Sequence, residues 1–311
     1  MRILVTGGAG FIGSNVADGF IAQGHDVAIL DNLITGLREN IPTAARFYEV
    51  DIRDAEGLRR VFDEFHPEVI VHHAAQMDVR RSLIDPVFDG DTNILGSLKL
   101  ILEAVRTGVK RFVYVSTGGA VYGEPKELPV PETHSINPEC AYGISKHTVE
   151  HYLELYRILS GLTYVVLRYP NVYGPRQNPH GEAGVNAIFI GLMLEGKTPM
   201  IFGDGDAVRD YVFVSDVVDA NIRALSKGDN QIFNIGSGIG TSVNQIYEKL
   251  QEILDFDKPA IHAPARPGEI QKVYLDARKA EKVLGWKPTV SFDEGLRRTV
   301  EWSRKRAMVR A

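Results

Sequence analysis

The sequence predicts an α/β protein built on a doubly wound parallel sheet, and three observations lead to this fold. An apolar run of strand composition at residues 3–5 is followed by a glycine cluster and an amphipathic helical segment. The alternation of strand and helix patterns continues to about residue 159, which implies parallel strands with helices on both faces. From about residue 174 the alternation loosens, as expected of a smaller α/β lobe. A chain of 311 residues can hold both parts of such a Rossmann-type protein.

The same patterns place the elements in order along the chain. In the first half we expect strands at 3–5, 25–30, 46–50, 69–71 and 111–115, and helices at 11–21, 55–65, 87–107 and 142–159. In the second half we expect helices at 184–194 and 215–225, and strands at 200–202, 208–214 and 231–235. The last strand is predicted to return to the first sheet. We therefore assign 1–173, with a returning segment at about 212–240, to the large domain and 174–311 to an interleaved smaller lobe.

A glycine-rich turn joins the first strand to the first helix. Gly7 permits a tight turn, Gly10 lets the backbone approach a pyrophosphate, and Gly13 lets the helix pack close to the strand. The helix N-terminus adds N–H donors and the positive end of its dipole. Asp31 ends the second strand eighteen residues after Gly13, where a carboxylate accepts both hydroxyls of an adenosine ribose and repels a 2′-phosphate. These features in this register predict a dinucleotide site that takes NAD rather than NADP.

A tyrosine and a lysine one helical turn apart carry the predicted chemistry. Tyr142 and Lys146 stand at i and i+4 near the start of the fourth helix, so their side chains lie on one face. The ammonium group and the positive ring of an oxidised nicotinamide together lower a tyrosine pKa from about 10 toward neutrality. The phenolate then acts as a general base on a substrate hydroxyl. A second match, Tyr122 with Lys126, contains Pro125, which breaks a helix, and we do not assign it a role.

Composition excludes several classes of function. The formal net charge is −5 with acids and bases interspersed, so no basic stripe indicates nucleic-acid binding. No apolar run is long enough to span a bilayer, and the N-terminal pattern is not that of a signal peptide. Cys140 is the only cysteine, which leaves no disulfide framework and no thiolate metal site. We expect a cytoplasmic protein without a metal, because the zinc-like pattern His147-x-x-Glu150-His151 is more typical of a solvated or interface patch.

These residues resemble a known family over essentially the whole chain. The sequence is similar to the extended short-chain dehydrogenase/reductases, and more closely to the NAD-dependent nucleotide-sugar epimerases of the UDP-glucose 4-epimerase type. The resemblance rests on the segment 6–13, Asp31-Asn-Leu, Asp51-Ile, Ala74-Ala-Gln, Asn93, the segment 121–123, Tyr142-x-x-x-Lys146, and the segments 168–176, 208–211 and 266–269. It implies tightly held NAD, a UDP-sugar substrate and a homodimer that pairs through the helices at 87–107 and 142–159.

The cofactor residues follow partly from the sequence and partly from this resemblance. Small side chains at Ala74 and Ala75 allow a ligand to approach the carboxyl end of the fourth strand. The resemblance implies that Asp51 and Ile52 flank the adenine and that Tyr169 packs near the nicotinamide. It also implies that Lys146 binds the nicotinamide ribose. The full set of expected cofactor residues is Gly7, Gly10, Phe11, Ile12, Gly13, Asp31, Asn32, Gly36, Asp51, Ile52, Ala74, Ala75, Gln76, Asn93, Tyr142, Lys146 and Tyr169.

The resemblance also implies a set of substrate residues. Asn171, Arg209, Arg266 and Glu269 would hold the nucleotide diphosphate, with both arginines on phosphate and Glu269 on the uridine ribose. Apart from the resemblance, Arg80 and Arg81 follow Ala75-Gln76 in the sequence, where they would contact a phosphate or a sugar carboxylate, or else form part of a solvated face. A further position concerns the size of the sugar. Val273 stands where some members carry a bulky tyrosine, and this smaller side chain leaves room for an N-acetylated sugar unless a shift of one residue brings in Tyr274.

The catalytic hydroxyl departs from the family's pattern. Gly118 stands where the usual serine is found, so we assign the hydroxyl role to Thr117, with Ser116 in reserve. Relatives that eliminate water or CO2 carry acids next to this hydroxyl, whereas this chain has Gly118-Gly119. The missing carboxylates favour plain oxidation and re-reduction at C4 of a UDP-hexose such as UDP-glucose or UDP-galactose, with N-acetylated forms left open.

Three alternatives remain open at this point. One is a UDP-uronate 4-epimerase, and a second is a reductase or dehydratase of the same branch. A third, of another class, is a non-enzymatic NAD-sensing regulatory protein, which needs Asp31 and the glycine turn but not the pair Tyr142 and Lys146. A separate expectation concerns the fourth strand, where His72 and His73 are predicted to be packed, hydrogen-bonded core residues.

Overall fold

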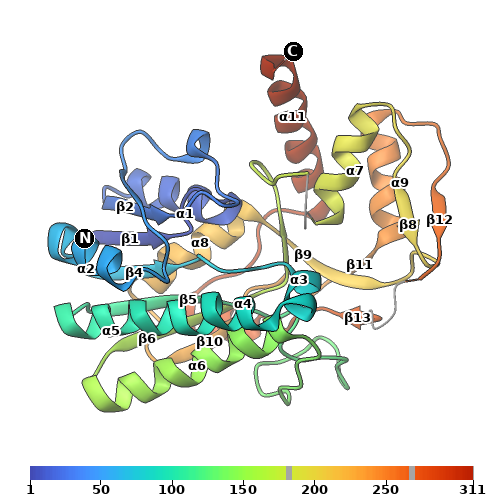
Figure 1. The fold of residues 1–311 in the computed structure, drawn as a ribbon. Coiled ribbons are helices and arrows are strands. Elements are labelled where there is room, and N and C mark those ends of the chain that lie inside the picture. The colour runs from blue at the N-terminus through green and yellow to red at the C-terminus, as the bar shows by residue number, and fades with distance from the viewer. Residues whose placement is uncertain (180–183, 266–269, 311) are drawn as a thin grey trace.

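The computed structural model describes residues 1–179, 184–265 and 270–310, which form two lobes (Figure 1). The larger lobe holds a seven-stranded sheet in the order β10-β6-β5-β4-β1-β2-β3, with every neighbouring pair parallel. Its strands are β1 (Arg2–Thr6), β2 (Asp26–Asp31), β3 (Arg46–Glu49), β4 (Val69–His72), β5 (Arg111–Thr117), β6 (Thr163–Tyr169) and β10 (Gln231–Asn234). The predicted Rossmann-type α/β fold is confirmed.

Helices cover both faces of this sheet. Side chains of α1 (Phe11–Ala22), α8 (Val214–Ala224) and α10 (Arg278–Leu284) share one buried cluster with Ile3 and Val5 of β1. Side chains of α2 (Ala55–Phe65), α5 (Ser97–Thr107) and α6 (Ala141–Ser160) share a second cluster with Leu4. Because successive residues of a strand point to opposite faces, a strand that is buried on both sides is a continuous apolar run. These strands could therefore be predicted from the sequence.

The predicted helix at 87–107 is wrong as a single element. The structure divides it into α4 (Pro86–Gly90), the π-helical turn η2 (Asp91–Gly96) and α5, preceded by α3 (Val79–Ile84). The Asp85 carboxylate caps α4, with Pro86 in its first turn. A π-turn adds a residue to the helix and is frequent at functional sites, and η2 carries Asn93.

The smaller lobe has its own sheets and core. One sheet holds β11 (Gly240–Ser242), β9 (Val208–Phe213), β13 (Lys272–Val273) and β7 (Asn171–Tyr173), and β8 (Met200–Phe202) pairs with β12 (Ile261–Ala263). Its helices are α7 (Val185–Leu194), α9 (Val243–Leu254) and α11 (Phe292–Arg310), and the short η1 (Arg38–Asn40) lies in the large lobe. Ser242 and Gln245 form a capping box at the start of α9.

The chain passes between the lobes several times, as Figure 1 shows. After β7 and β9 in the smaller sheet, α8 and β10 return to the large sheet. Trp286, which follows α10, is also buried in the core of the large lobe. The domain boundary at residue 173 stays a prediction. A further finding is that no helix in the described part of the chain has the length and apolar character needed to cross a membrane.

Candidate active site

The turn after β1 packs so closely against neighbouring backbone that two of its positions require glycine. Gly7 has φ +68°, in the left-handed region, and a Cβ atom there would lie 2.7 Å from the backbone nitrogen of Ala74. A Cβ atom on Gly13 would lie 2.3 Å from the carbonyl oxygen of Gly7. Helix α1 then starts after Gly10 without a side-chain cap. Uncapped N–H groups at a helix N-terminus bind anions such as a pyrophosphate, so this turn fits a dinucleotide.

The end of β2 presents a buried carboxylate. Asp31 accepts hydrogen bonds from the backbone N–H groups of Ala9 (3.0 Å) and Leu33 (2.8 Å), which hold it in place. Burial raises the pKa of Asp31, and these two bonds oppose the rise. A Cβ atom on Gly36 would lie 2.8 Å from an Asp31 oxygen, so glycine is needed there. A carboxylate has about four acceptor sites, and the sites that remain suit the two hydroxyls of a ribose.

The residues predicted to flank the adenine lie next to Asp31, at the same edge of the large sheet. The Asn32 side-chain amide donates to Asp51 (2.8 Å), and Ile52 is buried. A hydrogen bond from Arg53 lowers the pKa of Asp51 to about 2, although burial acts in the opposite direction. All the predicted cofactor residues of this region therefore lie beyond the carboxyl ends of β1, β2 and β3, where ligands bind in open parallel sheets.

The loop after β4 is held by a cluster of buried amides. The Asn93 side chain accepts from the backbone N–H of Gln76 (2.8 Å) and donates to the Gln76 carbonyl (2.9 Å) and to Ser145 of α6 (3.1 Å). Asp89 accepts from the side chains of Gln76 (3.0 Å) and Asn93 (3.1 Å). Its other oxygen is buried without a hydrogen-bond partner among the described residues. Asp89 adds a carboxylate near Lys146. The sequence patterns did not indicate this residue.

The candidate base and its lysine lie at the start of α6. Lys146 is buried, with its ammonium nitrogen 4.4 Å from the centre of the Tyr114 ring. Burial lowers the pKa of Lys146 to about 7, while Glu150 and Asp89 oppose that effect. Burial raises the pKa of Tyr142 above its usual value. The chain's own groups therefore act against the predicted lowering of the Tyr142 pKa. That prediction depended on two positive charges, the Lys146 ammonium and the ring of an oxidised nicotinamide.

Ser116 and Thr117, at the end of β5, differ in what their hydroxyls contact. Ser116 donates to Glu150 (2.6 Å), and Glu150 also accepts from the guanidinium of Arg168 (3.0 Å to Nε), all of them buried. Thr117 stands opposite Tyr169 in the register of β5 and β6. The Thr117 hydroxyl makes no hydrogen bond to any residue within 1–179, 184–265 or 270–310. Thr117 is thus free to bind a ligand, whereas Ser116 belongs to a structural ion pair.

Gly118 is explained by a residue from the other end of the chain. A Cβ atom at this position would lie 2.4 Å from the Cδ1 atom of Leu275, which is fully buried beside β13. A serine at this position would therefore require the Leu275 side chain to move. Leu275 in turn donates its backbone N–H to the buried carboxylate of Asp210 (3.0 Å), next to Arg209.

The predicted substrate residues lie on adjacent strands of the smaller lobe. In the registers of β7, β9 and β13, Asn171 stands opposite Tyr211, and Arg209 stands opposite Val273. Val273 is buried in a cluster with Val121, Tyr122, Val130 and Leu275. Arg80 is exposed on α3. Arg266 and Glu269 lie outside the described residues.

Comparisons with known proteins show the family of this chain. The sequence profile of the NAD dependent epimerase/dehydratase family matches residues 3–236. The chain belongs to this family. It is 45% identical over 314 residues to the UDP-glucose 4-epimerase of Mycolicibacterium smegmatis, which covers 99% of this chain and 100% of that protein.

Solved structures resemble this epimerase/dehydratase family member closely. The UDP-glucose 4-epimerase of Thermotoga maritima with UDP-glucose has a TM-score of 0.98 at 52% identity, covering 99% of this chain and 100% of that one. The UDP-glucose 4-epimerase of Thermus thermophilus in complex with NAD has a TM-score of 0.93 at 45% identity, covering 98% and 99%.

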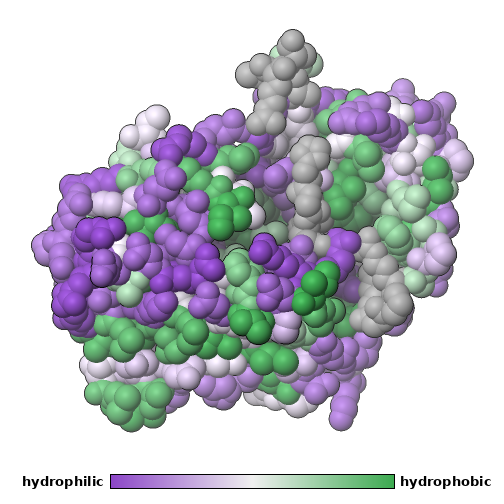
Figure 2. All heavy atoms as spheres, in the orientation of Figure 1, coloured by the Kyte–Doolittle hydropathy of each residue, from purple (hydrophilic) through white to green (hydrophobic). Residues whose placement is uncertain are grey.

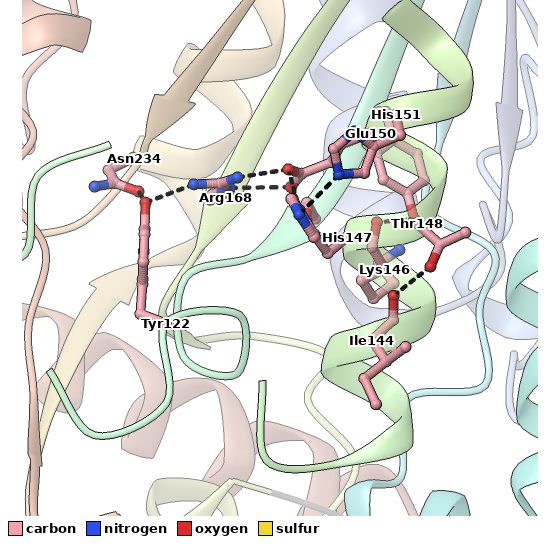
Figure 3. Close-up of polar contacts among 11 residues, drawn as sticks. Tyr122, Ile144, Lys146, His147, Thr148, Glu150, His151, Arg168 and Asn234 are labelled. Carbon is pink, nitrogen blue, oxygen red and sulfur yellow. Dashed lines mark hydrogen bonds and ion pairs between the residues drawn. The ribbon is translucent and has the colours of Figure 1, made fainter. Parts of the chain in front are cut away.

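In this family member, Glu150 of the zinc-like pattern on α6 forms the buried ion pair with Arg168, and the two histidines of the pattern lie beside it (Figure 3). A ring nitrogen of His147 lies 3.0 Å from Glu150, and the Nε2 atoms of His147 and His151 lie 3.0 Å apart. Hydrogen bonds from His147 and Arg168 hold the pKa of Glu150 at about 2, although burial alone would raise it. Within the described residues, no group of three or more His, Cys, Asp or Glu side chains is arranged to hold a metal ion.

Hydrogen bonds connect the ion pair of Glu150 and Arg168 to Tyr122, a residue to which the sequence analysis assigned no role. Arg168 donates to the Tyr122 hydroxyl (2.8 Å), and Tyr122 donates to Asn234 of β10 (2.8 Å), as Figure 3 shows. Tyr122 is thus a buried structural residue. Besides the zinc-like pattern, the available signal for Glu150 was its position four residues after Lys146, on the same helix face.

Proposed function

We propose that this chain interconverts the C4 epimers of UDP-hexoses, UDP-glucose and UDP-galactose, through a 4-keto intermediate with tightly bound NAD. The observations that carry the proposal are the pair Tyr142 and buried Lys146 at the start of α6, the free hydroxyl of Thr117 at the end of β5, and a glycine turn that fits a dinucleotide. Full-length similarity to proteins named UDP-glucose 4-epimerase supports the substrate.

The residues have distinct parts in this reaction. When bound, NAD supplies a hydride acceptor that returns the hydride to the same carbon. Tyr142 takes the proton of the 4-hydroxyl and gives it back. Thr117 holds the same oxygen by a hydrogen bond, and Lys146 binds the nicotinamide ribose and sets the charge near Tyr142. Asn171 and Arg209, with Arg266 and Glu269, hold the UDP, so that the keto sugar can turn about its diphosphate link.

The first test is the reaction itself. The purified protein is incubated with UDP-galactose, UDP-N-acetylgalactosamine and UDP-galacturonate without added NAD, and the products are identified by NMR. We expect conversion of UDP-galactose to UDP-glucose without net NADH. Faster conversion of either other sugar would reassign the substrate. No conversion of any sugar even with NAD would favour the regulatory alternative.

The two hydroxyls of β5 give a paired prediction. We expect Thr117→Val to lower kcat by about 10²-fold, because a hydrogen bond to the reacting oxygen is lost while the volume is kept. Ser116→Ala removes a bond to Glu150 and should lower the free energy of unfolding by about 1.5–3 kcal/mol. Its kcat should stay within about threefold of the wild type. Steady-state kinetics and urea unfolding measure both; a larger kcat loss in Ser116→Ala would reverse the assignment.

A homodimer that pairs through α5 and α6 is part of the proposal. Exposed apolar side chains lie on these helices, among them Leu102 (50% exposed), Ile158 (65%) and Leu159 (68%). Apolar surface is visible over both helices in Figure 2. Exposed apolar side chains gathered in this way are typical of a protein interface.

We expect Ile158→Glu with Leu159→Glu to give a monomer in light scattering, while Met308→Glu, at another exposed apolar residue, leaves the mass unchanged. A double variant that keeps the wild-type mass would contradict pairing through this face. We also propose a cytoplasmic location, because the single cysteine suits a reducing compartment.

A further inference from the structure

Two neighbouring histidines close the end of β4, and only one of them has hydrogen-bond partners. The ring of His72 is fully buried, with Nδ1 2.6 Å from the Thr6 hydroxyl and Nε2 2.9 Å from the Ser97 hydroxyl. The sequence prediction is confirmed for this residue. The ring centre of His73 lies 6.4 Å from that of Tyr169. Both ring nitrogens of His73 are buried, and neither has a partner among the residues that the structure describes, so the prediction is wrong for His73.

The His73 ring is neutral. Burial and the nearby charge of Lys146 lower its pKa to about 3. The Val71 carbonyl opposes this shift slightly but does not meet hydrogen-bond geometry with either nitrogen. A neutral imidazole has one donor and one acceptor nitrogen. Buried polar atoms are nearly always paired in native proteins, so two unpaired nitrogens in one ring point to a partner that a ligand supplies.

The surroundings of His73 identify that ligand. A Cβ atom on Gly7 would lie 2.9 Å from the His73 carbonyl carbon, so this residue packs against the turn that fits a pyrophosphate. On its other side lies Tyr169, predicted to pack near the nicotinamide, whose hydroxyl accepts from Asn221 (2.6 Å). The Asn221 carbonyl oxygen is also buried without a partner among the described residues. Tyr169 therefore neighbours both residues with unpaired buried atoms, and one of these, His73, adjoins the glycine turn through its backbone.

We propose that a ring nitrogen of His73 hydrogen bonds the nicotinamide half of the bound dinucleotide, which makes His73 a cofactor-binding residue. This proposal rests on the NAD binding of the proposed function. A phosphate oxygen, a ribose hydroxyl and the carboxamide all lie in that half of the molecule, and each can pair with a neutral imidazole.

The test replaces His73 by phenylalanine, which keeps the ring and removes both nitrogens. The holoenzyme is mixed with alcohol dehydrogenase and ethanol, which reduce any released NAD, and the release rate is followed as NADH absorbance. We expect His73→Phe to release NAD about fivefold to tenfold faster than the wild type, the size of one hydrogen bond. After NAD is stripped, its Tm should equal or exceed that of the stripped wild type, because two unpaired buried nitrogens are gone.

His72→Phe is the matched control on the other face of the sheet. It should lower the Tm, because Thr6 and Ser97 lose their partner, whereas its stripped form should bind NAD as the wild type does. Unchanged NAD release in His73→Phe, or a lowered Tm of its stripped form, would overturn the proposal. A wild-type protein that binds no NAD would instead overturn the proposed function together with this inference.

Binding of fragments locates the contact. Calorimetry compares stripped wild type and His73→Phe with AMP, ADP, ADP-ribose and NAD. If the variant binds ADP, ADP-ribose and NAD more weakly but AMP equally well, the contact is with the phosphate next to the nicotinamide ribose. If only ADP-ribose and NAD bind more weakly, the contact is with that ribose. If only NAD binds more weakly, the contact is with the carboxamide. Equal weakening of AMP would overturn the proposal, because AMP lacks the nicotinamide half.

Discussion

Replacing Tyr142 by phenylalanine is expected to lower kcat for UDP-galactose by about 10²–10⁴-fold while the protein keeps its NAD, because the ring remains and only the proton-transferring hydroxyl is lost. Turnover is measured by NMR, and bound NAD by its absorbance after the protein is denatured. The cofactor contacts predicted at the glycine turn and at Asp31 are untouched by this substitution, so a loss of NAD is not expected.

A second tyrosine of α6 provides the control for this experiment. Tyr152 is half-buried and its hydroxyl makes no hydrogen bond to a described residue, so Tyr152→Phe should leave kcat near the wild-type value. Near-normal turnover in Tyr142→Phe would remove the proposed base. Equal losses in both variants would indicate that the helix, and not the Tyr142 hydroxyl, had been damaged.

Replacing Glu150 by glutamine is expected to lower the free energy of unfolding by about 3–5 kcal/mol, because Arg168 is left as a buried, uncompensated charge. Urea unfolding followed by circular dichroism measures the change. The control is Glu154→Gln, one helical turn later, where the ion pair with Arg157 is partly exposed and contributes at most about 1 kcal/mol. A similar small loss in both variants would mean that the buried pair contributes no more than an exposed one.

The same carboxylate gives a pH dependence of known sign. The folded-state pKa of Glu150 is about 2, below its ordinary value of 4.5, so its charge stabilises the fold above pH 4.5. This contribution is lost as the pH falls from about 4.5 to about 2. The wild type should therefore lose its stability advantage over Glu150→Gln across that window, and a constant difference between the two would show that Glu150 is not charged in the fold.

Much of this site could be predicted because its signals are local. The turn at Gly7 and Gly13, the acid Asp31 and the pair Tyr142 and Lys146 each lie within a single strand–turn–helix or helix segment, where spacing alone fixes geometry. The strands of the large sheet are buried on both faces and appear as continuous apolar runs.

The remainder depends on contacts between distant segments. Ser116 and Thr117 have similar side chains, and only the position of Glu150 on α6 decides which hydroxyl is engaged. The amide cluster of Asp89 depends on the π-turn η2, which periodicity alone presents as an uninterrupted helix. His73 differs from His72 only in the face of the sheet to which it points, so composition could not separate them.

The contact between Gly118 and Leu275 couples two positions that are far apart in the chain. A serine introduced at 118 alone meets the Leu275 side chain, and a small residue introduced at 275 alone leaves a cavity beside Val273. Each single change therefore has a packing cost, which a paired change at both positions reduces. In evolutionary terms the pair is an epistatic constraint: moving the hydroxyl from Thr117 to position 118 requires a compensating change at Leu275, a residue more than 150 positions along the chain.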